Sequence, residues 1–449
     1  MSKQRIQLSD HFTYSRLLRF VLPCIGTMLF TSIYGIVDGL CVSNFVGKTA
    51  FAAVNLIMPL PMLLGTIGFM LGTGGSAIVG ITLGEGDQKK ADRYFTLFLL
   101  AALVSVSVLA VLGIVFLRPI AVLLGAKGEL LDYAVRYGRI LMVSLPTFAL
   151  QNMFQSFFVT AEKPHLGFWF TVGAGCTNMV LDVLMVGIWG WGVEGAAIAT
   201  FISQLVGGVL PVFYFIDRSN SSRLHLCKTS FYSKVLRDAC INGSSELMTN
   251  LSMSLVNILY NYQLLRLAGE NGVAAYGVIM YAAFLFVAVF VGYAVGSAPI
   301  VSFHYGARNH AEVHNLYRKS LRLIAVVAVT LTLASMFIIP CVARIFVGYD
   351  AELLALTSRA FRLYALSFLI MGFNVYASSF FTALGDGVTS ALIPFCRTLA
   401  FQVIAILLLP LLLGIDGIWL AVTAAELAAL AVSAAMLLTK DKVFHYRKA

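Results

Sequence analysis

Four carboxylates interrupt the apolar parts of this chain, and their chemistry is the first feature that needs an explanation. They are Asp38, Asp182, Glu246 and Glu426. An ionisable side chain at membrane depth is costly, so it commonly marks an ion or substrate pathway. Two of the acids have a polar residue one helical turn earlier, Tyr34 before Asp38 and Asn178 before Asp182. Residues four apart share a helix face, so each pair forms a polar patch.

The two acids of the first half have the character of a site for H⁺ or Na⁺. Burial disfavours the charged form of a carboxyl group, and two neighbouring carboxyl groups titrate as a unit, so the pair can load and release a proton near neutral pH. Together with Asn178, the oxygens of Asp38 and Asp182 can instead hold Na⁺. Other polar residues in the same half are Asn152, Gln155 and Thr200. The alternative is structural: a carboxyl group hydrogen-bonded to Tyr or Asn fixes helix packing.

The other two acids allow more than one interpretation. Glu246 lies near the beginning of its apolar run, in NGSSELMTN, and Glu426 lies in TAAELAAL. Glu246 either faces a substrate or is an acid near a helix N-terminus, where the helix dipole favours negative charge. For Glu426, snorkelling to the interface or lateral packing explains the residue as well as a functional role does.

The elements that must position these residues are transmembrane helices. Of the 449 residues, 59% are hydrophobic and 12% are charged, whereas about a quarter of the residues of a soluble domain are charged. The apolar runs predict twelve spans. They cover residues 16–43, 52–82, 94–117, 133–160, 166–188, 193–216, 235–267, 273–303, 320–347, 361–384, 389–413 and 417–438. The expected fold class is an all-α polytopic membrane protein.

Lysine and arginine are unevenly distributed between the two sides of this arrangement. Most of the 31 lysine and arginine residues fall on the side that holds both termini and the loops after even-numbered spans. Arg397 is counted on this side. The positive-inside rule therefore predicts that both termini lie in the cytoplasm. The expected location is a bacterial cytoplasmic membrane. The same distribution explains the net charge of +10 without a nucleic-acid partner, and a basic surface favours contact with anionic membrane lipid.

An internal repeat divides the chain into two halves. At an offset of about 222 residues, Gly84 falls on Gly306, and the turn GVEG at 192–195 falls on GIDG at 414–417. Each half holds six spans, so the repeats run parallel, with a pseudo-twofold axis along the membrane normal and a cleft between two bundles. The predicted domains are an N-terminal bundle (1–216), a cytoplasmic linker (217–234) and a C-terminal bundle (235–449).

The second half lacks the acids of the first. At the repeat offset, Tyr260 takes the place of Asp38, and Ile404 takes the place of Asp182. A stable fold has similar requirements for helix packing in both halves, so a polar cluster in one half alone indicates a functional role. The sequence contains no G-x-x-x-x-G-K-[ST] pattern, and no span has a His and an acid at metal-ligand spacing. These features argue against an ATPase and an intramembrane enzyme, so no catalytic residue and no cofactor is expected beyond a coupling ion.

Several stretches together resemble the MATE transporters, the multidrug and toxic compound extrusion family, over essentially the whole chain. The stretches are VDG at 37–39, GTGGSAIVGITLGEGD at 72–87, TNMVLD at 177–182, GVEGAAIAT at 192–200, GVAAYGV at 272–278 and GSAPIVSFHYGARN at 296–309. The resemblance implies a V-shaped, two-lobed protein of twelve helices. It also implies an antiporter that exports organic, often cationic compounds in exchange for H⁺ or Na⁺.

The resemblance also implies which residues couple transport to the ion. The DinF-like branch of the family has an N-lobe network, which is matched here by Tyr34, Asp38, Tyr137, Asn152, Asn178, Asp182 and Thr200. Gln155 stands where many of those relatives have a second Asn. The NorM-like branch uses acids of the C-lobe, but span 361–384 has no acid here, and Glu246 lies about two turns before the position that branch uses. The resemblance therefore favours N-lobe coupling.

The expected mechanism is alternating access, in which one bundle rocks against the other. Neutralising Asp38 and Asp182 changes the preferred helix packing, with Pro23 as a hinge in the first span. Soft side chains tolerate varied ligands, and the candidates for substrate contact, besides Glu246, are Met58, Met62, Met280 and Tyr281. The expected partners are small organic cations or drugs, and the expected state is a monomer. The main alternative is a lipid-linked oligosaccharide flippase, which needs a cationic cleft for a diphosphate; a channel needs no titratable pair in one bundle.

Overall fold

The computed structural model consists of helices and their connections. It describes residues 6–46, 48–348 and 350–447, without the side chains of residues 38–44, 48, 51, 342, 345 and 346. The first half, here called the N-bundle, contains α1 (Tyr14–Phe45), α2 (Lys48–Ile57), α3 (Pro59–Gly84), α4 (Gln88–Leu123), α5 (Glu129–Thr160), α6 (Pro164–Leu181), the π-helical segment η1 (Asp182–Ile188), α7 (Gly192–Gly208) and α8 (Leu210–Ile216).

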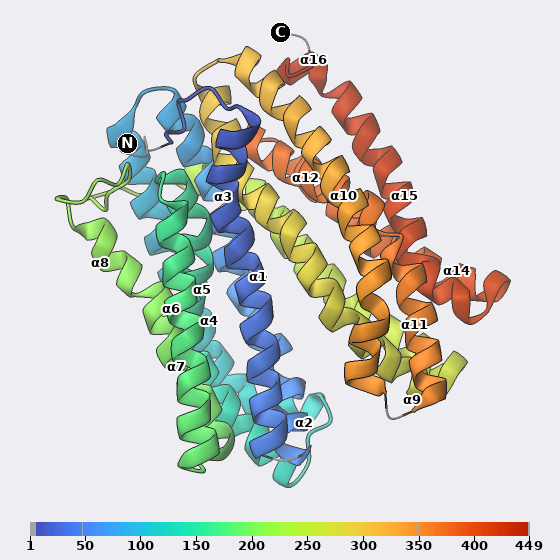
Figure 1. The fold of residues 1–449 in the computed structure, drawn as a ribbon. Coiled ribbons are helices and arrows are strands. Elements are labelled where there is room, and N and C mark those ends of the chain that lie inside the picture. Colours follow the sequence, from blue (N-terminus) through green and yellow to red (C-terminus); the bar gives the residue numbers. More distant parts are fainter. Residues whose placement is uncertain (1–5, 47, 349, 448–449) are drawn as a thin grey trace.

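The second half is here called the C-bundle. It contains α9 (Ser233–Gly306), α10 (His310–Val347), α11 (Ala351–Ala365), α12 (Phe368–Leu384), α13 (Gly387–Pro394), the π-helical segment η2 (Phe395–Phe401), α14 (Gln402–Leu413), α15 (Ile415–Thr439) and α16 (Asp441–Phe444). The two bundles meet at the end of the molecule that carries both chain termini, here called the termini end. They diverge toward the opposite end, which gives a V shape (Figure 1).

The twelve predicted spans all correspond to helices. By length and hydropathy, nine helices of the described residues can cross a membrane, or ten if α11 and α12, which bend by 47° at their junction, form one crossing. One of them, α9, has 74 residues and holds two predicted spans, which are separated where Gly269 adopts φ 61° and ψ −151°. The remaining predicted span lies in α5. The all-helical fold class is therefore confirmed, and many helices extend past the predicted ends.

Polar caps fix where several helices begin outside the apolar core. The side chain of Asp87 accepts a hydrogen bond from the backbone nitrogen of Lys90 at 3.0 Å and begins α4. Asn309 begins α10 and Asp386 begins α13 in the same way. Each cap satisfies a backbone donor that a helix leaves unpaired at its N-terminus. These caps therefore fix the first residues of α4, α10 and α13.

Glycines let the two bundles approach backbone to backbone at the termini end. A Cβ atom at Gly306 of α9 would lie 2.1 Å from the carbonyl oxygen of Ile81 in α3, and one at Gly84 of α3 would lie 2.0 Å from the carbonyl oxygen of Phe303 in α9. Gly84 and Gly306 are the positions that the repeat offset superposes. This reciprocal contact, here called the glycine seam, is what a pseudo-twofold axis between the bundles produces.

An ordered N-terminal segment, which lies outside the twelve predicted spans, crosses the termini end. The segment Ile6–Thr13 is here called the strap. Its Leu8 amide donates to Oε1 of Glu162 at 2.9 Å, in the connection between α5 and α6 of the N-bundle. Its Phe12 amide donates to Oε1 of Glu312 at 2.9 Å, in α10 of the C-bundle. Leu8 and Phe12 are fully buried, so the strap joins the two bundles.

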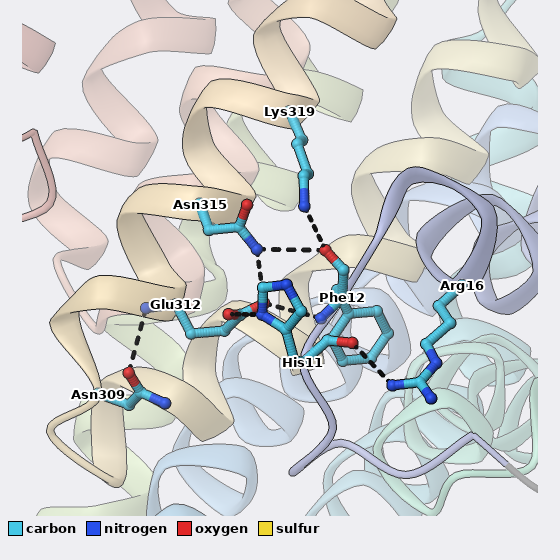
Figure 2. A network of polar contacts seen from close by, with 7 residues as sticks. All are labelled: His11, Phe12, Arg16, Asn309, Glu312, Asn315 and Lys319. Carbon is cyan, nitrogen blue, oxygen red and sulfur yellow. Dashed lines mark hydrogen bonds and ion pairs between the residues drawn. The ribbon is translucent and has the colours of Figure 1, made fainter.

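Polar contacts converge on the C-bundle anchor of the strap (Figure 2). Nδ1 of His11 lies 2.6 Å from Oε2 of Glu312, and Nδ2 of Asn315 donates to Oε1 of the same carboxylate at 2.8 Å. Nζ of Lys319 donates to the carbonyl oxygen of Phe12 at 2.7 Å. Hydrogen bonds to a charged group contribute about 1.5–3 kcal/mol, so Glu312 is the residue on which this anchor depends.

Replacing Glu312 by Gln is expected to release the strap. The neutral amide no longer pairs with His11 and accepts more weakly from the Phe12 amide, so backbone amides 6–13 should exchange hydrogen at least about tenfold faster. Hydrogen–deuterium exchange with mass spectrometry measures this. The matched control is Glu352→Gln in the first turn of α11, which should leave exchange of the strap unchanged. Equal protection of the strap in both variants contradicts the assignment of Glu312 as its anchor.

Candidate functional site

The N-bundle buries three polar side chains from α5, α6 and η1, here called the N-bundle cluster. Asp182 is 0% exposed, Asn178 2% and Asn152 5%. Asp182 is the first residue of η1, and π-helical segments within α-helices occur frequently at functional sites. The amide nitrogens of Asn152 and Asn178 are buried and have no hydrogen-bond partner among the described residues. Such groups cost free energy when buried alone, which indicates a function beyond packing.

The predicted residues of α1 approach this cluster from the side of α6. A Cβ atom at Gly175, one turn before Asn178, would lie 3.1 Å from the ring of Tyr34. Tyr34 therefore contacts the helix that carries Asn178 and leads into Asp182. The side chain of Asp38 lies outside the described part of the structure, although its backbone belongs to α1, one turn after Tyr34. Its pairing with Asp182 stays a prediction.

Three other predicted residues lie around the cluster in different surroundings. Tyr137 is buried in an apolar group with Val186 of η1 and Val193 of α7. Thr200 lines a small N-bundle cavity of about 50 Å³. Gln155 lines a different, narrow recess beside Cys24 of α1. That the three belong to one coupling network stays a prediction.

The small N-bundle cavity contains residues with two different predicted roles, contact with substrate and coupling to the ion. Its lining includes Met58 and Met62, both predicted to contact substrate, together with Thr200 and Gln204. Met62 is 56% exposed, so it lies at the open side of this cavity. Thr200 and two of the soft apolar side chains therefore lie close together in the N-bundle.

A larger cavity of about 230 Å³ lies where the bundles meet, mostly within the C-bundle. It is here called the central cavity. The N-bundle contributes Thr73 and Ser76 of α3 and Ser156 of α5. Two predicted substrate residues, Glu246 and Met280, line it, together with further methionine and aromatic side chains from α9, α11 and α12: Met253, Tyr260, Tyr276, Phe284, Tyr364 and Met371. Tyr281, also predicted, is not part of this lining, and its side chain is 42% exposed.

Glu246 presents a carboxylate to the central cavity. Its backbone oxygen accepts a hydrogen bond from Asn250 at 2.9 Å. Among the described residues, however, no hydrogen bond or ion pair involves its side-chain oxygens. Glu246 lies in the fourth turn of α9, which begins at Ser233, so a helix N-terminal role does not explain it. A carboxylate without a protein partner on the wall of a largely apolar cavity is suited to a cationic ligand.

Glu426 and Arg397 form a buried ion pair in the lining of the same cavity. Nε of Arg397 lies 2.7 Å from Oε1 of Glu426, and Nδ2 of Asn374 donates to Oε2 at 2.7 Å. Glu426 is 2% exposed, so it does not snorkel to the interface. Arg397 lies in η2 within the predicted span, so counting it among the loop residues of the basic side was wrong. A buried pair of this kind is retained only with good geometry and further hydrogen bonds, and Asn374 supplies one.

Several residues that line the central cavity were not predicted from the sequence. Tyr260 and Tyr276 stack with ring centroids 4.9 Å apart. A signal for Tyr260 was present, because the repeat offset superposes it on Asp38. The signal for Arg397 was its position inside an apolar run. With Glu246 and Glu426 acidic and Arg397 basic, the charged side chains of the cavity lining sum to one negative charge.

Comparison with known proteins agrees with this architecture. The chain is 21% identical over 436 residues to the multidrug export protein MepA of Staphylococcus saprophyticus subsp. saprophyticus, covering 96% of this chain and 95% of that one. MepA of Staphylococcus aureus MSSA476 is 21% identical over 433 residues, with 96% and 95% covered.

Solved structures share the fold over the full length. One, described as the outward-facing conformation of a multidrug resistance MATE family transporter of the MOP superfamily, is 22% identical with a TM-score of 0.92, and 100% of each chain is covered. A MATE structure in the straight conformation is 22% identical with a TM-score of 0.91, again over 100% of each chain. The family model MatE matches residues 23–184 and, separately, residues 247–408. This chain is therefore a member of the MatE family of polytopic membrane transporters.

Proposed function

We propose that the protein is a secondary active exporter of organic cations, driven by inward movement of H⁺ or Na⁺ across the bacterial cytoplasmic membrane. The observation that carries the proposal is Glu246, a carboxylate without a protein partner in a cavity lined by methionine and aromatic side chains. Membership of the MatE family and the similarity to proteins named as multidrug exporters support the direction of transport.

The central cavity fits a class of ligands rather than a single shape. Tyrosine and phenylalanine rings attract cations over their faces, and Met253, Met280 and Met371 repack around ligands of different outline. Glu246 supplies the opposite charge. Because Arg397 and Glu426 already neutralise one another at 2.7 Å, a ligand with one positive charge balances the cavity.

The N-bundle cluster is the proposed coupling site, as in the DinF-like branch of the family. Asp38 and Asp182 bind the coupling ion, with Tyr34, Asn152 and Asn178 adjacent and Tyr137, Gln155 and Thr200 in the surrounding shell. A membrane potential of 100 mV contributes roughly 2.3 kcal/mol per charge, and a pH difference of one unit contributes about 1.4 kcal/mol. Exchange of one H⁺ for one monovalent cation moves no net charge, so the potential cancels and a pH difference of one unit supports an export ratio of about ten.

Alternating access follows from the two bundles and the way they meet. With the basic termini end in the cytoplasm, the described V shape faces outward, and the glycine seam and the strap close the cytoplasmic side. Protonation at the N-bundle changes the packing preference of α1, which carries Pro23, and the bundles then separate at the seam. No cofactor takes part; the ion itself is a transported substrate.

A lipid-linked oligosaccharide flippase is less well supported by the central cavity. A diphosphate headgroup needs several cationic side chains that are not neutralised. The charged residues of the lining are Glu246, Arg397 and Glu426, and the single arginine is paired. The charge of the cavity therefore favours a cation over a polyanion.

Replacing Glu246 by Gln is expected to weaken binding of a monocationic dye about ten- to hundredfold, because about 1.5–3 kcal/mol of charged hydrogen bonding is lost. The change in fluorescence on titrating the purified protein with dye measures the dissociation constant. Glu270→Gln, an exposed position of the same helix, is the matched control and should bind as the parent does. If Glu246→Gln binds the dye with parental affinity, the proposed substrate class is wrong.

A further inference from the structure

A recess on the outer side of the N-bundle lies apart from both cavities described above. It is an open space of about 900 Å³ between the first turns of α1 and α6, two helices that run side by side (Figure 1). Its lining comprises Ile6, Arg16, Arg19, Phe20, Leu22, Pro23, Gly26, Glu162, Pro164, His165 and Phe168. It is here called the α1–α6 recess.

The α1–α6 recess opens to the surface of the molecule rather than to the junction of the bundles. The opposite face of α1 makes that junction: Cβ atoms at Gly292 and Gly296 of α9 would lie 2.5 Å from Ile25 and 2.9 Å from Val21. Leu22, which points into the recess, is 55% exposed, and Trp169, adjacent to Phe168 on α6, is 64% exposed. Large apolar side chains exposed on a membrane helix lie against lipid.

The charge of the recess is positive. Arg16 and Arg19 are exposed and His165 is an exposed hydrogen-bonding ring. The one acid of the lining, Glu162, is already paired, since its Oε1 lies 2.6 Å from Nη1 of Arg223 and accepts the Leu8 amide at 2.9 Å. The two arginines therefore keep their charge for a ligand from outside the chain.

In the recess, polar side chains lie near the first turns of the two helices, and apolar side chains lie deeper. Arg16 and Arg19 lie in the first two turns of α1, and Leu22, Pro23 and Gly26 follow over the next two turns, about 10 Å farther along the helix. On α6, His165 lies at the first turn, and the ring of Phe168 reaches to 3.0 Å from a Cβ position on Gly26. This order matches a phospholipid, whose phosphate lies at the interface and whose acyl chains lie deeper.

We propose that the α1–α6 recess binds an anionic phospholipid. Its phosphate contacts Arg16, Arg19 and His165, and an acyl chain lies along Leu22 and Phe168. Basic pockets between helices at the interface bind anionic headgroups, and each arginine near such a surface contributes about a fivefold preference. Planar guanidinium groups suit phosphate because they donate two parallel hydrogen bonds.

Native mass spectrometry of the purified protein with phosphatidylglycerol or phosphatidylcholine tests this proposal. The parent is expected to retain phosphatidylglycerol in preference, and Arg19→Gln to lose about fivefold of that preference. Arg19→Lys keeps the charge and should retain part of it. The matched control is Arg318→Gln, an exposed arginine of α10 at the same end of the molecule, which should bind lipid as the parent does.

A second variant and a second readout keep the test independent of folding. His165→Gln should also lower retention of phosphatidylglycerol, and the rise in unfolding temperature that this lipid gives the parent should shrink in both variants. Equal loss in Arg19→Gln and Arg318→Gln means diffuse surface attraction and overturns the site. Equal retention of the two lipids by the parent overturns it as well.

Discussion

Liposomes that contain Asp182→Asn protein are expected to show no gradient-driven accumulation of a fluorescent cation. A pH difference of one unit provides about 1.4 kcal/mol per proton and supports about a tenfold concentration ratio. Without a titratable group at this fully buried position, the ratio should fall to about one. The same loss is expected under an imposed Na⁺ gradient if Na⁺ is the coupling ion. Dye fluorescence during an imposed gradient measures the ratio.

Two controls separate lost coupling from lost folding in this experiment. Asn has nearly the shape of Asp, so gradient-free exchange of labelled for unlabelled cation should survive in Asp182→Asn. Asp132→Asn changes an exposed acid in the first turn of α5 and should accumulate cation as the parent does. Asp38→Asn should match Asp182→Asn if the two acids act as a pair. A tenfold ratio that persists in Asp182→Asn refutes the N-bundle coupling site.

Gly306→Val should hold the bundles apart at the termini end. A Cβ atom there meets the carbonyl oxygen of Ile81 at 2.1 Å, and that backbone atom belongs to α3 and cannot rotate away. Overpacking costs about 1–3 kcal/mol, which shifts the ratio of closed to open seam by roughly five- to 150-fold. Distances between spin labels on α3 and α9 should therefore lengthen at this end. Gly84→Val should do the same through the carbonyl oxygen of Phe303.

Gly277→Val is the matched control, because it lies in the same helix and a Cβ atom there has no neighbour within 4 Å. It should leave the label distances of the parent unchanged. If Gly306→Val also leaves them unchanged, the seam does not restrict the approach of the bundles. A lengthening in both variants indicates a general effect of valine on α9 rather than a contact at the seam.

The fold was largely predictable because its strongest signals are local. Runs of apolar residues between charged connections mark the crossings. The repeat offset pairs Gly84 with Gly306, and both glycines lie at the glycine seam of the structure. The predicted spans 235–267 and 273–303 already separated the two parts of α9 at Gly269. The predicted span 361–384 instead ran across the bend between α11 and α12. Helix ends were less predictable, because several helices continue into the connections through caps such as Asp87 and Asn309.

The central cavity was only partly predictable. Glu246 and Met280 were identified from residue type, whereas the meaning of Arg397 and Glu426 depends on a contact between residues far apart in sequence. Hydropathy gives a charged residue inside a span the same value whether it is paired, solvated or facing lipid. Sequence alone could therefore flag Glu426 but could not find its partner.

The strap could not be predicted from the sequence, for a different physical reason. Its anchoring contacts use the backbone amides of Leu8 and Phe12, and every residue except proline has such a donor. No side-chain pattern reveals a segment that binds through its main chain. Its side-chain features are the burial of Leu8 and Phe12 and the contact of His11 with Glu312, and three apolar residues among eight are too few to predict ordered structure.

This mode of attachment has a consequence for how the protein can change over evolution. Apart from the contact of His11 with Glu312, the strap is held through main-chain groups, so the chemical specificity of the contact lies mainly in the two accepting carboxylates, Glu162 and Glu312. Homologues can therefore be expected to diverge freely in most of the leading segment, provided that proline stays out of the two donor positions, while the acids that receive it persist. An alignment of many orthologues should therefore show variable residues in the strap and an acid at the positions of Glu162 and Glu312.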